Sequence, residues 1–111
     1  MIDKWSISFV NEKSEGEVLG LSPDLKAKFL HIGDMLQDFG PQKMGLPHIR
    51  PLGKKLWELR LKGKDNIARS IYVLASRKRI VILHTFIKKT QKTPDKALKI
   101  ALSRLKEIDN D

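Results

Sequence analysis

The chain has 111 residues, of which 41% are hydrophobic, and its 22 Lys and Arg outnumber 13 Asp and Glu to give a formal net charge of +9. This length predicts a single domain over residues 1–111, no apolar run is long enough to span a membrane, and the absence of cysteine excludes disulfides and thiolate metal sites. The chain start lacks a signal-peptide layout, so we expect a cytoplasmic protein, and the charge favours a polyanionic partner, nucleic acid before an acidic protein.

One strand and two helices are predicted in the first half of the chain. Residues 4–11 alternate between apolar and polar side chains, which is typical of a half-buried strand, and residues 12–21 predict a short helix. Ser22 is a candidate N-cap for a longer helix that begins at Pro23 and ends before the next glycine-proline pair. This helix carries one apolar stripe, formed by Leu25, Phe29, Ile32, Leu36 and Phe39.

Three strands and a final helix are predicted in the second half. Residues 42–53 are rich in glycine and proline and predict a loop. The three segments that follow are rich in β-branched residues or alternate in polarity, and their short connections favour antiparallel pairing. Thr93 and Pro94 are expected to cap and open the last helix. The strand segments are 55–62, 67–75 and 80–87.

This order of elements predicts an α+β fold with an N-terminal strand and helical hairpin, a small, mainly antiparallel sheet and a C-terminal helix. The helices are expected against one side of the sheet. Motifs of several enzyme classes are missing: the three histidines have no HxH or HExxH neighbour, and there is no phosphate-binding loop and no GxSxG serine. We therefore expect no metal site and no cofactor.

Arg69 is an informative charge, because it interrupts an otherwise apolar strand face. An unpaired buried guanidinium is costly, so Arg69 either pairs with a carboxylate, for which Glu58 is the candidate, or serves a bound anion. Arg60 is expected on the strand face opposite Trp57.

His84 and Phe86 each have two interpretations. His84 is two residues from both Ile82 and Phe86, so the period-two pattern predicts that the three share one strand face. His84 is either a hydrogen-bonded, half-buried histidine or a proton-transfer group. Phe86 is either a core residue or a surface on which a nucleic-acid base stacks.

A lysine-rich loop connects the last strand to the last helix. Lys88, Lys89 and Lys92 precede a helix N-terminus, whose amide groups and partial positive charge suit a phosphate. The alternative is a solvated loop. The same two interpretations apply to Lys54 and Lys55 and to the basic turn at residues 77–79.

The segments "GKKLWELRL", "IARSIYVL" and "RIVILHTFIKKTQKTP", followed by "ALSRLKEI", resemble the HigB-type, phage-derived branch of the RelE/ParE toxin superfamily. The resemblance extends roughly from residue 46 to residue 108, and its lysine-rich "HTFIKKTQKTP" part is the most specific. Ala68 departs from the family, which often has an aromatic residue just before the arginine corresponding to Arg69.

The resemblance implies a toxin that cuts mRNA on the ribosome without a metal, through attack of the RNA 2′-hydroxyl on the adjacent phosphate. By position, Arg60 and Arg69 brace the scissile phosphate, and His84 transfers a proton or positions a base. Lys88 and Lys89 hold flanking phosphates or ribosomal RNA. The implied RNA-binding set also includes Lys54, Lys55, Phe86 and Lys92, with Lys54 a weaker candidate for the base.

The implied partners are the ribosome, mRNA and a small antitoxin with a helix-turn-helix domain of the HigA type. One arrangement that the resemblance implies for toxin and antitoxin together is a heterotetramer. Two other functions stay open from the sequence. One is a ParE-like toxin that binds DNA gyrase without cutting RNA, and the other is a basic nucleic-acid-binding module without activity.

Overall fold

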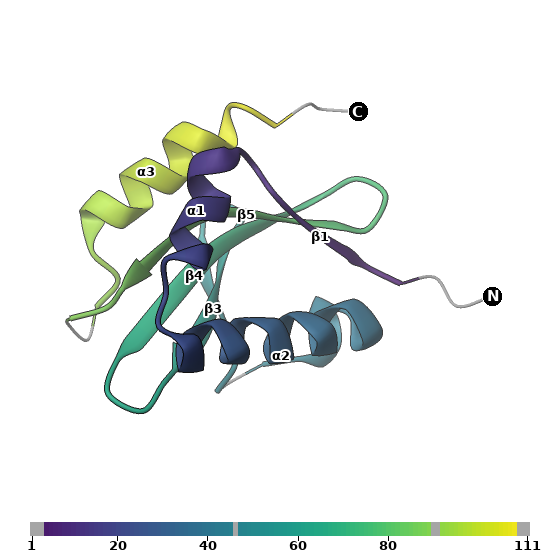
Figure 1. Cartoon of the computed structure of the whole chain (residues 1–111). Coiled ribbons are helices and arrows are strands. Elements are labelled where there is room, and N and C mark those ends of the chain that lie inside the picture. Colours follow the sequence, from purple (N-terminus) through teal and green to yellow (C-terminus); the bar gives the residue numbers. More distant parts are fainter. Residues whose placement is uncertain (1–3, 46, 90–91, 109–111) are drawn as a thin grey trace.

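The computed structural model describes residues 4–45, 47–89 and 92–108. These residues form a five-stranded sheet with helices on both faces (Figure 1), which confirms the predicted α+β class. In chain order, the elements are β1 (Ser6–Phe9), α1 (Glu12–Leu19), α2 (Pro23–Phe39), the 3-10 helix η1 (Pro41–Lys43), β2 (Ile49–Gly53), β3 (Leu56–Lys62), β4 (Ile67–Ala75), β5 (Arg79–Ile87) and α3 (Asp95–Leu105).

The sheet is mainly antiparallel, as predicted. Its strand order is β1-β5-β4-β3-β2, in which β1 runs parallel to β5 and the other neighbours pair antiparallel. The meander from β2 to β5 therefore builds most of the sheet, and the N-terminal strand adds its last edge.

The helices α2 and α3 lie on opposite faces of this sheet (Figure 1). Along β5, Ile80 and Ile82 pack with residues of α2, whereas Val81 and Leu83 pack with residues of α3. The prediction that the helices cover one side is wrong, because both faces of the central strands are apolar and each needs a cover to exclude water.

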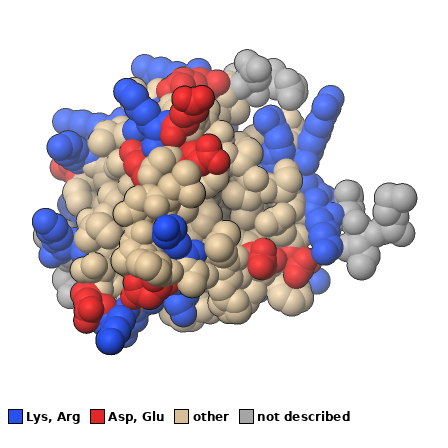
Figure 2. Space-filling model, viewed as in Figure 1, with Lys and Arg blue, Asp and Glu red and all other residues tan. Residues whose placement is uncertain are grey.

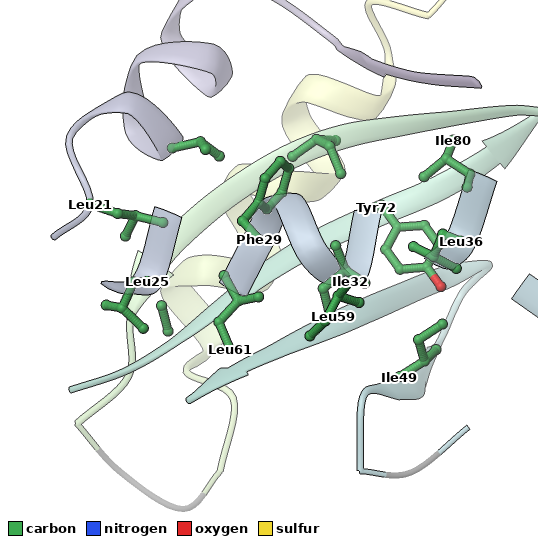
Figure 3. Close-up of a cluster of buried hydrophobic side chains, with 13 residues drawn as sticks. Leu21, Leu25, Phe29, Ile32, Leu36, Ile49, Leu59, Leu61, Tyr72 and Ile80 are labelled. Atoms are coloured by element: carbon green, nitrogen blue, oxygen red, sulfur yellow. The ribbon is translucent and has the colours of Figure 1, made fainter. Parts of the chain in front are cut away.

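The larger core lies between α2 and the sheet (Figure 3). Full burial of a leucine or isoleucine side chain contributes about 1.5–3 kcal/mol, so the predicted stripe is the main attachment of α2. The buried part of the stripe ends at Leu36. Phe39, in the last helical turn, was predicted to belong to the stripe but is 60% exposed. The indole of Trp5 packs against the backbone of Gly40 at this end of the helix. The buried members of the stripe are Leu25, Phe29, Ile32 and Leu36.

The segment predicted as a loop, residues 42–53, contains an edge strand. β2 pairs with β3 from Ile49 to Gly53, with a register shift between Pro51 and Gly53. Proline has no amide hydrogen to donate, but it is tolerated in an edge strand, where one row of backbone groups faces away from the sheet. Because proline and glycine are typical of loops, the sequence pattern predicted a loop where the structure has a strand.

Neither predicted N-cap makes the expected hydrogen bond. Ser22 is at the N-cap position of α2, but its hydroxyl donates to Asp24 Oδ1 at 2.6 Å. Thr93 lies one residue before the N-cap of α3, and its hydroxyl donates to Glu58 Oε2 at 2.9 Å. Both hydroxyls have carboxylate acceptors, and a charged acceptor makes a stronger hydrogen bond than a neutral one.

A β-bulge in β5 changes the face on which His84 lies. The register pairs Tyr72 with Ile82 and Ile71 with His84, so Leu83 is an extra residue between the two pairs. His84 therefore lies on the α3 side with Ile71, whereas Ile82 lies on the α2 side. The predicted sharing of a face by His84 and Ile82 is wrong, because an inserted residue shifts the period-two alternation.

The charged residues are unevenly spread over the surface. Figure 2 views the molecule from the side of α2, where uncharged atoms cover much of the centre and many of the visible Lys and Arg side chains stand at the margin. Among the described residues, the helices are too short or too polar to cross a membrane.

Candidate active site

Two arginines lie side by side on the α3 side of the sheet, where β5 ends. The register pairs Arg60 of β3 with Arg69 of β4, and Arg69 in turn with Phe86 of β5. Directly paired residues project on the same face of a sheet. The amide of Lys88 donates to the Ile67 carbonyl at 2.7 Å, which extends the β4–β5 pairing past Phe86. We name Arg50, Arg60, Arg69 and Lys88 the cationic cluster.

A buried carboxylate lies within the cationic cluster. Glu58 is fully buried and pairs in register with Arg50. Its Oε1 atom lies 3.5 Å from Arg69 Nε, so the predicted pairing of these two residues is confirmed. Its Oε2 atom accepts the hydrogen bond from Thr93, which ties the segment before α3 to β3. Neither Arg69 Nε nor Glu58 Oε1 has a hydrogen-bond partner among the described residues.

Lys88 is, with Arg69, a buried member of the cationic cluster. Only 9% of this residue is exposed. Burial lowers the pKa of Lys88, the charges of Arg69, Arg60 and Arg50 lower it further, and Glu58 opposes them. Burial likewise lowers the pKa of Arg69, against the attraction of Glu58. Crowded like charges of this kind are stabilised when an anion such as a phosphate binds among them.

Two hollows on the surface border the cationic cluster. One has a volume of about 280 Å³ and is lined by Pro47, Arg60, Lys62, Ile67 and Arg69. The other, of about 410 Å³, lies between β2 and the start of α3, and its lining includes Arg50 and Lys92. Both hollows thus combine cations with space for part of a nucleotide chain.

The other predicted RNA-binding lysines lie at different places. Lys89 is exposed next to Lys88, and Lys92 is exposed beside the second hollow, while residues 90–91 lie outside the described part of the chain. Lys54 and Lys55 form the β2–β3 turn at the far end of β3. At about 3.4 Å per residue, Lys55 is roughly 17 Å from Arg60, so these two lysines do not join the cationic cluster.

His84 belongs to a partly buried hydrogen-bond network that connects α1, β5 and α3. Its Nδ1 atom lies 3.0 Å from Glu17 Oε1, which also accepts from the Thr85 amide at 3.0 Å and from Arg104 Nη1 at 2.9 Å. Arg104 Nη1 also donates to the Leu83 carbonyl at 2.9 Å. The hydrogen-bonded interpretation of His84 is therefore confirmed for one of its two ring nitrogens.

The network also determines the tautomer of His84. Burial raises the pKa of Glu17, but hydrogen bonds from Arg104, the Thr85 amide and His84 outweigh it, and the net pKa is below the ordinary value. An ionised Glu17 only accepts, so at the 3.0 Å contact Nδ1 of a neutral His84 donates and Nε2 carries the lone pair. Arg104 Nη1 lies farther from the same Nδ1, at 3.5 Å, and donates to Glu17 and to a backbone carbonyl of β5 instead. The ring stacks on Phe86, with centroids 5.4 Å apart.

Replacing Glu17 by glutamine is expected to lower the free energy of unfolding at pH 7 by about 1–3 kcal/mol, because hydrogen bonds to a charged acceptor are lost. The folded-state pKa of Glu17 is depressed, so its contribution is present above the ordinary value of 4.5 and disappears as the pH falls through the lower folded value. Urea unfolding of both proteins between pH 3 and pH 7 should show curves that converge in acid. A constant difference would contradict this assignment.

Several residues of this region were not identified from the sequence. Arg50 lies in the segment predicted as a loop, so nothing indicated that it would face Glu58. Glu17 and Arg104 are 67 and 87 residues from their partners in the network, and no local pattern connects them. Among the described residues, no group of three or more His, Cys, Asp or Glu is placed to hold a metal ion.

A family model matches most of the chain. The model of the family described as Phage derived protein Gp49-like (DUF891) matches residues 17–106. This range contains every member of the cationic cluster and the whole Glu17–His84–Arg104 network. A search of curated proteins found no match.

Proposed function

This chain belongs to the Gp49-like family of phage-derived proteins, a RelE/ParE-like toxin family, and we propose that it is the toxin of a type II toxin–antitoxin system. More specifically, we propose a HigB-type endoribonuclease that cuts mRNA on the ribosome. The observation that supports this proposal best is the cationic cluster, in which two strands present Arg60 and Arg69 as direct neighbours beside the buried Lys88.

The proposed reaction is an in-line attack of the RNA 2′-hydroxyl on the adjacent phosphate. The 2′-oxygen forms a bond to phosphorus while the bond to the 5′-oxygen breaks, which leaves a 2′,3′-cyclic phosphate and a 5′-hydroxyl. The transition state gathers negative charge on the phosphate oxygens. Arg60 and Arg69 stabilise that charge, because guanidinium groups held in place by the sheet need little reorganisation. A metal ion has no role in this scheme.

A base must take the proton of the 2′-hydroxyl, and an acid must give one to the 5′-oxygen. His84 is one candidate, since its Nε2 atom carries the lone pair when the ring is neutral. Lys88 is the second candidate, because its charge interacts with both arginines and its pKa is lowered by burial. Lys89 and Lys92 hold flanking phosphates in this proposal, and Phe86 offers a ring for base stacking.

The proposed partners are the ribosome, its mRNA and an antitoxin, for which a HigA-like helix-turn-helix protein in a heterotetramer is the expected form. An acidic segment of the antitoxin would cover the cationic cluster and thereby block RNA. The +9 charge of the chain would speed that encounter. All of these partners act in the cytoplasm in this proposal.

Expression of the chain alone is expected to arrest translation and to produce new 5′ ends in mRNA, which primer extension detects. These ends should disappear when the same mRNA is not translated. Induction of the DNA-damage response with intact mRNA would instead indicate a gyrase-binding toxin of the ParE type. Normal growth with full expression of folded protein would indicate a nucleic-acid-binding module without activity. Either of these results would contradict the proposed function.

A further inference from the structure

The two hairpin turns at the far end of the sheet share an unusual backbone conformation. Lys54 and Lys55 connect β2 to β3 with φ values of 53° and 69°, and Arg77 and Lys78 lie between β4 and β5 with φ values of 62° and 56°. Among the described residues, these are the non-glycine residues with positive φ, and all of them carry a positive charge. We name these four residues the turn patch.

Left-handed backbone is unfavourable for lysine and arginine, because their Cβ atoms crowd the following carbonyl oxygen. The two-residue turn between Gly53 and Leu56 has positive φ at both central positions, a type I′ turn for which Asn-Gly is the preferred sequence. Cations therefore occupy positions where uncharged residues would be more stable. Strain of this kind is concentrated at functional sites.

The two sequence segments that contain the turn patch carry only positive charges. Residues 50–57 and 75–81 contain no Asp or Glu, and the side chains of the turn patch are exposed. The β3–β4 turn at the opposite end differs, because it includes Asp65 beside Lys64, whose amide is bound by Asp24. The two turns of the turn patch therefore differ in charge from the β3–β4 turn.

The register places both turns at the same end of the sheet, away from the cationic cluster. The two turns are about two strand spacings apart across the sheet, or roughly 10 Å, and the β4–β5 turn lies about three residues, again roughly 10 Å, farther along the strands. Lys55 lies roughly 17 Å from Arg60, and Arg77, eight residues beyond the Arg69 that pairs with Arg60, lies roughly 27 Å away. Both distances are too long for the turn patch to hold the phosphate that Arg60 would contact.

We propose that the turn patch is a second RNA-binding surface, which holds the sugar-phosphate backbone of a folded RNA while the cationic cluster holds the strand to be cut. This inference rests on the proposed function in taking RNA as the target. It assigns the turn patch to docking, since exposed cations bind phosphates without reading the sequence.

The test replaces each turn by the residues that its backbone prefers: Lys54→Asn with Lys55→Gly, and Arg77→Asn with Lys78→Gly. Each pair of changes is expected to raise Tm, because the strain is relieved. Each is also expected to weaken binding of a fluorescein-labelled 24-base-pair RNA duplex several-fold. The slope of log Kd against log salt concentration should become shallower by about 0.7–0.9 for each phosphate contact that is lost.

The control removes the same charge from exposed residues of α3 and its C-cap, with Lys99→Gln and Lys106→Gln. It is expected to bind the duplex nearly as the original protein does. Turn variants that gain stability and keep their affinity would overturn the proposal, and so would an equal loss in the control, since net charge alone would then explain binding. The duplex assay involves no cleavage. A chain that binds the duplex through the turn patch but never cuts mRNA would refute the proposed function alone.

Discussion

Replacing Arg69 by alanine is expected to abolish toxicity and to lower the free energy of unfolding by about 3–5 kcal/mol. The first effect follows from the proposed role of Arg69 at the phosphate, where loss of one positioned donor costs on the order of 10²–10³ in rate. The second follows from Glu58, which is fully buried and would lose its nearest cation. Growth after induction and urea unfolding measure the two effects separately.

A loss of toxicity in Arg69→Ala alone does not separate catalysis from folding. The double change Glu58→Leu with Arg69→Met removes both charges and fills their space with apolar atoms. Such replacements of buried ion pairs are often neutral or stabilising, so the double variant is expected to recover most of the lost stability and remain non-toxic. Growth arrest by this variant, at original strength, would remove Arg69 from the proposed mechanism.

Replacing Lys88 by methionine is expected to abolish toxicity and to raise stability at pH 7. Its folded pKa is depressed below the ordinary value of 10.5, so at pH 7 the buried charge costs stability that methionine does not. Between the folded and the ordinary pKa, the unfolded chain binds more protons, and the stability of the original protein therefore rises with pH. Urea midpoints measured from pH 7 to pH 11 should show the advantage of the variant shrinking.

Lys89→Met is the matched control, because it removes the same charge from the exposed neighbour of Lys88. We expect it to leave the urea midpoint nearly unchanged and to reduce toxicity less. If Lys88 transfers a proton, its loss should slow cleavage by roughly 10²–10⁴. Equal toxicity of the Lys88→Met variant and the original protein would show that the buried ammonium is dispensable.

Local patterns in the sequence were sufficient for most of the secondary structure. The apolar stripe of α2 repeats over several helical turns, and apolar and polar residues alternate along β3. Both patterns depend only on residues that are close together in the chain. β2 was missed because Pro51 resembles a loop residue unless the strand is known to lie at an edge. The position of α3 across the sheet from α2 also escaped prediction, since apolar strands do not indicate which helix will cover which face.

The candidate site was predictable only in part. Arg69 stood out because a charge interrupted an apolar strand, and its possible partner Glu58 lay on the preceding strand. Arg50, Glu17 and Arg104 carried no comparable signal. The sequence also did not show which lysines join the cationic cluster. Lys54 and Lys88 both lie next to a strand, but only Lys88 belongs to the cluster.

By itself, the sequence determined the helices α1, α2 and α3, four of the five strands, the α+β class and the excess of positive charge, because periodicity, turn residues and composition act over short stretches of chain. Only the tertiary structure decided which charges meet. Glu58 reaches Thr93 across 35 residues, and Glu17 reaches His84 across 67. Such contacts depend on strand register, on the bulge at Leu83 and on how the helices pack, and these are settled by the burial of the whole chain rather than by any one segment.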